Sequence, residues 1–384
     1  MTTQIESLDL HGIDSSVQGH YTASPVKHMI YGLGAIQNLL SLVQSIGASK
    51  AFIITGRSLS KTPVIKQVQS ILGDAHAGTF NEIGQHAPID AIRKAITLFK
   101  ESSADILVSV GGGSPIDSAK VVAHTFHGDT GKWIPQIAVP TTLSVAETTQ
   151  NAGFTNDEGQ KVGISDSELV PKAVLYDGEL ALHTPIELWT STGLRALDHA
   201  LELLYHPQAS EFPTKRLGLE AIRDLFAYLP ASKAKPEDVE VRQRLLIAAY
   251  GALFPFLYRG SVGLSHSIGH AVGAAYGIPH GITSCMSLAP VLHHKADSSE
   301  EAARQIARAL PYIGKKAAAE GNHKAAAHAV ADAVDELVTN LGLKRALAMY
   351  NVPPGQEEAI AIRGLRSPEH PDLEACKKIV RGLY

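Results

Sequence analysis

The chain has 384 residues, 45% of them hydrophobic and 19% charged. This is ordinary globular composition, and the length is more than one hydrophobic core comfortably serves, so we expect two domains. The formal net charge of −4, without a basic tract, makes nucleic acid and anionic membranes poor candidate partners. The first residues lack an apolar signal core and a transit pattern, and no apolar run approaches the roughly 18 residues of a membrane span. The two cysteines, Cys285 and Cys376, offer no disulfide framework, and we expect a cytoplasmic protein.

The first half of the chain alternates short apolar runs with helical patterns. Apolar runs bounded by turn residues predict strands at 50–55, 105–110, 137–139 and 174–176. Apolar residues at helical spacing predict helices at 63–72 and 88–100. Strand–helix alternation is typical of a doubly wound parallel sheet, and we expect a dinucleotide-binding α/β domain over residues 1–189.

Beyond about Pro185 the strand signal disappears and helical periodicity continues to the end of the chain. Helices are predicted at 214–229, 239–258, 264–276, 300–310 and 324–341. The alanine-rich stretch that follows Lys315 is expected to be helix-prone surface. We therefore expect an all-helical domain over residues 190–384, packed closely against the first.

A glycine-rich loop follows the predicted strand at 105–110. Its sequence, Gly111-Gly112-Gly113-Ser114-Pro115-Ile-Asp117, is neither the GxGxxG nor the GxxxxGK[ST] pattern. Glycines allow close approach of a pyrophosphate, and Ser114 as N-cap with Pro115 in the first turn would present a helix N-terminus to an anion. We assign Gly111, Gly112, Gly113, Ser114 and Asp117 to cofactor binding; a tight turn without a ligand is the plain alternative.

Gly56, Arg57 and Ser58 follow the first predicted strand, where the adenosine ribose of a dinucleotide would lie. An acidic residue there binds the ribose 2′-hydroxyl and repels a 2′-phosphate. This chain has an arginine and a hydroxyl instead, which favours NADP(H) over NAD(H). A surface arginine in a turn is the alternative.

Histidines gather in one stretch of the second half. His266 and His270 are four residues apart and share a helix face, and a turn at Pro279 and Gly281 could return His280 to them. An upstream stretch, 194–202, offers His199. Converging imidazoles form a metal site, a proton relay or an anion cradle, although the chain has 18 histidines and such pairs also arise by chance.

Together these motifs resemble the iron-containing alcohol dehydrogenase superfamily, whose members pair a dinucleotide-binding domain with a helical domain. The matching segments are Tyr31-Gly-Leu-Gly34, the glycine-rich loop, Pro140-Thr141-Thr142, Asp198-His199-Ala-Leu-Glu202 and the His266/His270/His280 array. The length of the loop after Pro140 and His86-Ala-Pro88 most resemble maleylacetate reductases. The resemblance implies that Thr141, Thr142 and Lys161 contact the cofactor, with a solvated Lys161 as the alternative, and that the protein is a homodimer.

The resemblance also exposes a departure at residue 195. Metal-dependent relatives carry an aspartate ligand four residues before the helical histidine, and this chain has Arg195 there; the other ligands would be His199, His266 and His280. A unit charge about 5 Å from a divalent ion costs roughly 7 kcal/mol at an effective dielectric near 20. We therefore expect no catalytic metal, unless Arg195 turns outward and three imidazoles retain one.

These observations predict an NAD(P)H-dependent reductase acting on a carbonyl or activated C=C of a small substrate that carries a carboxylate. Arg195 and the histidines would stabilise the oxyanion, and His270 would donate the proton. The alternatives are a metal-dependent alcohol dehydrogenase, a lyase or cyclase of the dehydroquinate synthase type, and a non-catalytic nucleotide-binding protein.

Overall fold

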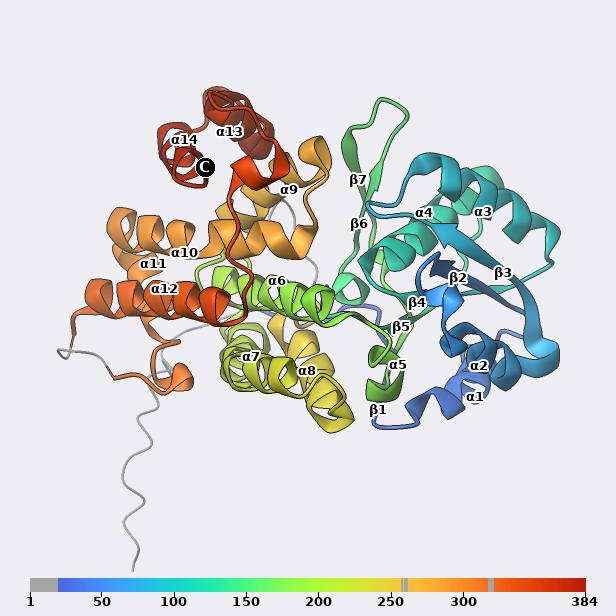
Figure 1. The fold of residues 1–384 in the computed structure, drawn as a ribbon. Helices are drawn as coiled ribbons and strands as arrows, with labels where there is room; N and C mark the ends of the chain where they lie inside the picture. The colour runs from blue at the N-terminus through green and yellow to red at the C-terminus, as the bar shows by residue number, and fades with distance from the viewer. Residues whose placement is uncertain (1–19, 257, 259–261, 317–320) are drawn as a thin grey trace, which may run out of the picture.

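The computed structural model describes residues 20–256, 258, 262–316 and 321–384. In them an α/β half is followed by a helical half, and the two lie side by side (Figure 1). The alanine-rich stretch expected near Lys315 and the N-terminal segment fall largely outside the described residues. Among the described helices, none is long and apolar enough to cross a membrane.

Six parallel strands form the main sheet, in the order β1-β8-β5-β4-β2-β3. They are β1 (His28–Tyr31), β2 (Ala51–Gly56), β3 (His76–Ile83), β4 (Ile106–Gly111), β5 (Gln136–Pro140) and β8 (Ala173–Tyr176). The four predicted strands are present, and they are the ones buried along nearly their whole length. The two unpredicted strands lie at the sheet edges, where partial exposure breaks up the apolar run.

Helices cover both faces of this sheet. Helices α1 (Leu39–Ser45) and α2 (Pro63–Leu72) share one apolar core with it, and α3 (Ile89–Glu101) and α4 (Gly113–Thr130) share another. This is the doubly wound arrangement expected from the alternating pattern. An antiparallel hairpin of β6 (Asn151–Thr155) and β7 (Lys161–Ser165) lies between this half and the helical half (Figure 1).

A buried lysine on α4 holds the segment that leads into this hairpin. Lys120 is fully buried, and its Nζ donates to the carbonyl oxygens of Ala146, Thr149 and Asn151 at 2.6, 2.7 and 2.8 Å. Burial lowers the pKa of Lys120 to about 8. The three carbonyl oxygens replace the water that the ammonium lost on folding.

The helical half is built around α6 (Ile186–Leu204), which is buried from Trp189 to its end. A helix that is buried on every side lies inside a core. Around it are α5 (Gly178–Ala181), α7 (Arg216–Ala234), α8 (Val239–Ala252), α9 (Leu264–Tyr276), α10 (His280–Ser298), α11 (Glu300–Ala307), α12 (His323–Asn340), α13 (Glu357–Leu365) and α14 (Leu373–Arg381).

Several predicted helices agree closely with the structure, and two predicted ranges extend beyond the observed helix ends. Helix α9 has the predicted bounds of 264–276. Helix α8 ends at Ala252 rather than 258, because Pro255 disfavours helical geometry before it. Helix α11 ends at Ala307 rather than 310, shortly before Pro311. No strand follows β8 in the described part of the chain.

Candidate active site

The carboxyl ends of β2, β4 and β5 bring the predicted cofactor residues to one edge of the sheet. Strand pairing aligns Gly111 with Pro140, and the amide of Thr141 donates to the Gly111 carbonyl at 2.9 Å. A Cβ added at Gly112 would lie 3.0 Å from the Thr142 side chain. Backbone at 112 therefore passes close to Thr142, which only glycine permits without movement. This edge is where parallel sheets bind dinucleotides.

The start of α4 differs from the expected capping pattern. We predicted Ser114 as N-cap, but the helix begins at Gly113 and Gly112 is the N-cap residue. Gly112 has extended backbone angles, and its carbonyl already accepts from the Ile116 amide at 3.4 Å. Ser114 thus lies in the first turn. The amides of Gly113 and Ser114 are among those that a helix leaves without an internal partner, and they suit a phosphate.

Four other predicted cofactor residues lie after β2 or on α4. Arg57 and Ser58 are exposed immediately after β2, and Gly56 pairs with Ile83 in the sheet. The Asp117 carboxylate instead accepts a hydrogen bond from the Gly153 amide at 3.1 Å. Asp117 therefore anchors the β6–β7 hairpin to α4, and its contact with a cofactor stays a prediction.

The hairpin carries Lys161 to a strained segment of the α/β half. Lys161 Nζ donates to the His86 carbonyl at 3.2 Å. His86 and Ala87 both have positive φ, 62° and 52°, a conformation that costs about 1–3 kcal/mol and tends to be retained at functional sites. The hydroxyl of Thr155 also donates to the His86 carbonyl, at 3.2 Å. Burial, followed by the charge of Lys161, lowers the pKa of His86 to about 4.

The histidines form two neighbouring groups where the two halves meet. His199 on α6 lies against His266 on α9, with ring centroids 4.3 Å apart. His280, the first residue of α10, lies 5.4 Å from His270 and 5.1 Å from His86. The turn expected between α9 and α10 is present: Gly277 has φ 67° and Pro279 precedes α10. The structure thus brings all four predicted histidines to one region and adds His86.

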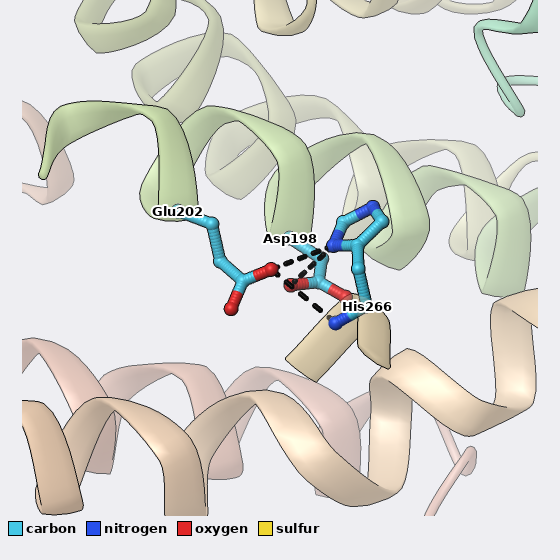
Figure 2. Close-up of side chains that lie close together, drawn as sticks. All are labelled: Asp198, Glu202 and His266. Carbon is cyan, nitrogen blue, oxygen red and sulfur yellow. Dashed lines mark hydrogen bonds and ion pairs between the residues drawn. The ribbon is translucent and has the colours of Figure 1, made fainter. Parts of the chain in front are cut away.

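Two carboxylates of α6 hold His266 in place (Figure 2). Asp198 and Glu202 are fully buried and four residues apart, and both project toward His266. Glu202 Oε2 lies 2.7 Å from His266 Nδ1, and Asp198 Oδ1 lies 3.5 Å from the same atom. Because the carboxylates occupy the Nδ1 side, Nε2 faces the other way and finds no hydrogen-bond partner among the described residues.

Glu202 also caps the N-terminus of α9 from another helix. Its oxygens accept from the amides of Ser265 and His266, at 2.8 and 3.3 Å. These are first-turn amides, which lack partners inside the helix and favour an anion. A Cβ at Gly263 would lie 2.3 Å from Glu202, so the glycine leaves room for the carboxylate. One residue thereby sets both the start of α9 and the orientation of the His266 ring.

Arg195 points inward, contrary to the alternative in which it leaves the site. Its side chain is 8% exposed, and Nη1 donates to Ser284 Oγ at 3.1 Å. Ser284 in turn donates to Asp198 Oδ2 at 2.5 Å, and the same oxygen lies 3.7 Å from Arg195 Nη1. Ser265 also donates to that oxygen, at 3.0 Å. The guanidinium is therefore fixed between α6 and α10 beside the histidines.

The charges separate the histidines into one favoured cation and three neutral rings. Desolvation and Arg195 act to lower the pKa of His266, but Asp198 and Glu202 outweigh them, so its pKa is raised. Desolvation, joined by Arg195 and neighbouring imidazoles, lowers the pKa of His199, His270 and His280 well below the ordinary value. Of these, His270 has the most exposed side chain. The site therefore holds the Arg195 guanidinium, and an imidazole whose protonated form is favoured, beside two carboxylates.

Two sets of residues are candidates for ligands of a metal ion. The predicted nitrogens of His199, His266 and His280 do not form a compact ligand group in the described residues; the compact group, with atoms within 4.8 Å of one another, is Asp198, Glu202 and His266. Two carboxylates and an imidazole could bind zinc or iron. Asp198 Oδ2 and both Glu202 oxygens already accept from serine hydroxyls and α9 amides, whereas the buried Asp198 Oδ1 has no hydrogen-bond partner among the described residues. The group could therefore hold a metal ion, and the nearby charge of Arg195 opposes this.

Sequence comparison agrees with this architecture across nearly the whole chain. Residues 26–178 match the iron-containing alcohol dehydrogenase family, and residues 189–379 match the C-terminal region of the Fe-containing alcohol dehydrogenase family. Maleylacetate reductase from Burkholderia cepacia is 30% identical over 348 residues, which cover 89% of this chain and 90% of that protein. This chain belongs to the iron-containing alcohol dehydrogenase family.

As a member of this family, the protein is an NAD(P)-dependent oxidoreductase similar to maleylacetate reductases. Maleylacetate reductase from Rhizobium sp. (strain MTP-10005) is 30% identical over 249 residues, which cover 64% of this chain and 66% of that protein. The crystal structure of an iron-containing alcohol dehydrogenase from Corynebacterium glutamicum matches with a TM-score of 0.80 and 27% identity, covering 96% of this chain and 97% of that one.

Several residues of this site were not assigned a role from the sequence. Asp198 and Glu202 were visible in a family motif, but only the fold shows that they orient His266. Ser284, which joins Arg195 to Asp198, carried no sequence signal that we could use. His86 was noted only as part of His-Ala-Pro. The signal that could have identified His86 as a site residue is its position directly before an Ala-Pro pair and shortly after a strand.

The low pKa of His86 predicts a loss of stability in acid. The unfolded chain binds the proton near pH 6.5 and the folded protein only near pH 4, so this contribution is complete above about pH 6.5 and falls as pH drops toward 4. Between pH 7 and 5 the wild type should lose about 1 kcal/mol through this ring, after allowance for partial exposure. His86→Asn, which tolerates positive φ, should show a shallower fall in urea unfolding. An equal fall in both proteins would contradict the assignment.

Proposed function

We propose that this protein is an NADPH-dependent reductase that delivers hydride to a carbonyl or activated C=C of a small substrate bearing a carboxylate, without a catalytic metal. The observation that carries the proposal is the buried Arg195, fixed by Ser284 beside Asp198 and next to the histidines. Only Nη1 of this guanidinium donates a hydrogen bond to the described residues. Its other N–H groups suit a carboxylate or a developing oxyanion.

Different residues of the chain would bind the cofactor and stabilise the reacting groups. Bound nicotinamide supplies the hydride. Backbone amides at the start of α4 and the glycine-rich loop would hold the pyrophosphate, and Lys161 would lie near the nicotinamide half of the site. Arg195 and His266 Nε2 would stabilise the negative charge that hydride addition creates. The structure favours His266 as the cationic donor, because its pKa is raised. His270, our first choice for the proton, would act as a neutral imidazole.

A metal-dependent alcohol dehydrogenase is the second candidate, and one observation favours it. Asp198, Glu202 and His266 place two oxygens and a nitrogen within 4.8 Å of one another. A cation there would replace the proton between His266 Nδ1 and Glu202 Oε2, and Asp198 Oδ1, which has no hydrogen-bond partner among the described residues, could ligate it. The charge of Arg195 would remain close by. The effect of chelation on activity distinguishes the two candidates.

The assignment of the α4 N-terminus to the cofactor phosphates predicts a specific response to Ser114→Asp. A carboxylate in the first turn of a helix favours the helix, by about 0.3–1 kcal/mol, but would repel a pyrophosphate. We expect thermal stability to be kept and the Kd for NADPH to rise at least tenfold in fluorescence titration. Ser114→Asn, similar in size and uncharged, is the matched control. Equal affinities of the two variants would contradict the assignment.

The preference for NADPH rests on Arg57 and is tested separately. A hydrogen bond to a charged group contributes about 1.5–3 kcal/mol, so Arg57→Ala should lower kcat/KM with NADPH at least tenfold. The same substitution should leave kcat/KM with NADH nearly unchanged, because NADH has no 2′-phosphate. Steady-state kinetics with both nucleotides provide the comparison. A parallel loss with NADH, or no loss with NADPH, would show that Arg57 does not read the phosphate.

The metal-free mechanism predicts activity that survives chelation and depends on Arg195. After chelator treatment that removes iron and zinc, the protein should still oxidise NADPH in step with reduction of a keto acid. Arg195→Lys keeps the charge near Asp198 but loses the planar fork, and should lower kcat/KM by about 10²–10³. Ser114→Asn serves as a folded control. Loss of activity on chelation, with recovery on adding metal, would favour the second candidate; turnover without NADPH oxidation would indicate a lyase or cyclase.

A further inference from the structure

A second histidine cluster lies on the helical half, away from the catalytic residues. His293 on α10 and His328 on α12 face each other, with their Nδ1 atoms 2.7 Å apart and their ring centroids 5.0 Å apart. Their side chains are 38% and 29% exposed, so solutes can reach them. His293 is thirteen residues after His280 on the same helix, which corresponds to about 20 Å along its axis.

Each imidazole is held from behind by a carboxylate of the opposite helix. His293 Nε2 lies 3.3 Å from Asp332 of α12, and His328 Nε2 lies 3.2 Å from Asp297 of α10. Both helices carry the same spacing, a histidine followed four residues later by an aspartate. Each helix thus supplies the carboxylate that faces the histidine of the other helix. This arrangement orients both Nδ1 atoms toward one point between the helices.

The 2.7 Å contact requires a proton or a metal cation between the two Nδ1 atoms. An ionised carboxylate only accepts hydrogen bonds, so an Nε2 that donates to an aspartate, as His328 Nε2 can to Asp297, carries the proton of its ring. A neutral imidazole protonated at Nε2 has a lone pair at Nδ1. Two such lone pairs 2.7 Å apart repel each other unless a proton or a metal cation lies between them. Histidines whose second nitrogen donates to a carboxylate are the usual ligands of zinc.

We propose that His293 and His328 bind a divalent transition metal such as Zn²⁺ through their Nδ1 atoms, joining α10 to α12. At Zn–N distances of about 2.0–2.1 Å and tetrahedral angles, the two nitrogens would lie about 3.3 Å apart. The distance between the two Nδ1 atoms would have to increase by about 0.6 Å, which small side-chain rotations can supply. Water or an aspartate that swings inward completes the coordination. Asp332, 72% exposed, is freer to do so than Asp297, which pairs with Lys324 at 2.7 Å.

The test is zinc binding to the full-length protein after chelation, measured by titration calorimetry and by thermal shift. His328→Gln should lower the zinc stoichiometry by one per chain relative to wild type, or weaken that site at least tenfold, and should abolish the zinc-induced rise in Tm. His323→Gln changes an exposed histidine of the same helix and should behave as wild type. NADPH-dependent activity should be unchanged in both, since neither residue lies at the catalytic site.

A milder variant keeps the proposal falsifiable if His328→Gln folds poorly. Asp332→Asn leaves both imidazoles but removes the carboxylate behind His293, and should weaken zinc binding about 10–100-fold. Equal zinc stoichiometry and affinity in wild type, His328→Gln and Asp332→Asn would overturn the proposal and leave a shared proton as the occupant. A loss in His323→Gln as large as that in His328→Gln would also overturn it.

Discussion

The balance of buried charge around Arg195 is the constraint on which the rest of the site depends. A guanidinium inside a helical core is tolerated only if acids and hydrogen-bond acceptors accompany it. Asp198 meets this need directly and through Ser284, and Glu202 adds a second negative charge on the next turn of α6. The same two acids then raise the pKa of His266. Arg195 and His266 are thus compensated by the same two carboxylates.

The two halves of the molecule supply different parts of the chemistry. Parallel pairing brings the ends of β2, β4 and β5 to one edge, where backbone glycines and a helix N-terminus would form the proposed nucleotide side. The helical half supplies side chains from α6, α9 and α10. His86 joins the two, because it belongs to the α/β half and its ring contacts His280 at the start of α10. The strained backbone at His86 and Ala87 is therefore explained by the contact that it makes.

Hydrophobic periodicity predicted those helices and strands whose residues follow one local pattern. Strand β4 is fully buried, and the apolar residues of helix α9 keep helical spacing, so both could be located from a local pattern. Partly exposed β1 and β3 follow no single rule, and neither does the hairpin. The histidines could be found from their spacing and a family resemblance. The cap that Glu202 provides to Ser265 spans 63 residues of sequence, and the inward direction of Arg195 depends on Ser284, so neither could be derived before the fold was known.

Lys120 has a consequence for how the enzyme can open and close. Its ammonium holds three carbonyl oxygens in the segment from Ala146 to Asn151, and separating them would leave a buried charge without partners. The hairpin, with Lys161, is therefore tied to α4 of the α/β half. Gln150, in the same segment, also donates to the Tyr258 carbonyl of the helical half at 3.1 Å. Any hinge between the halves would have to bend two covalent links of the described chain: the connection between β8 and α6, and the segment before β1, where Tyr21 donates to the Pro255 carbonyl.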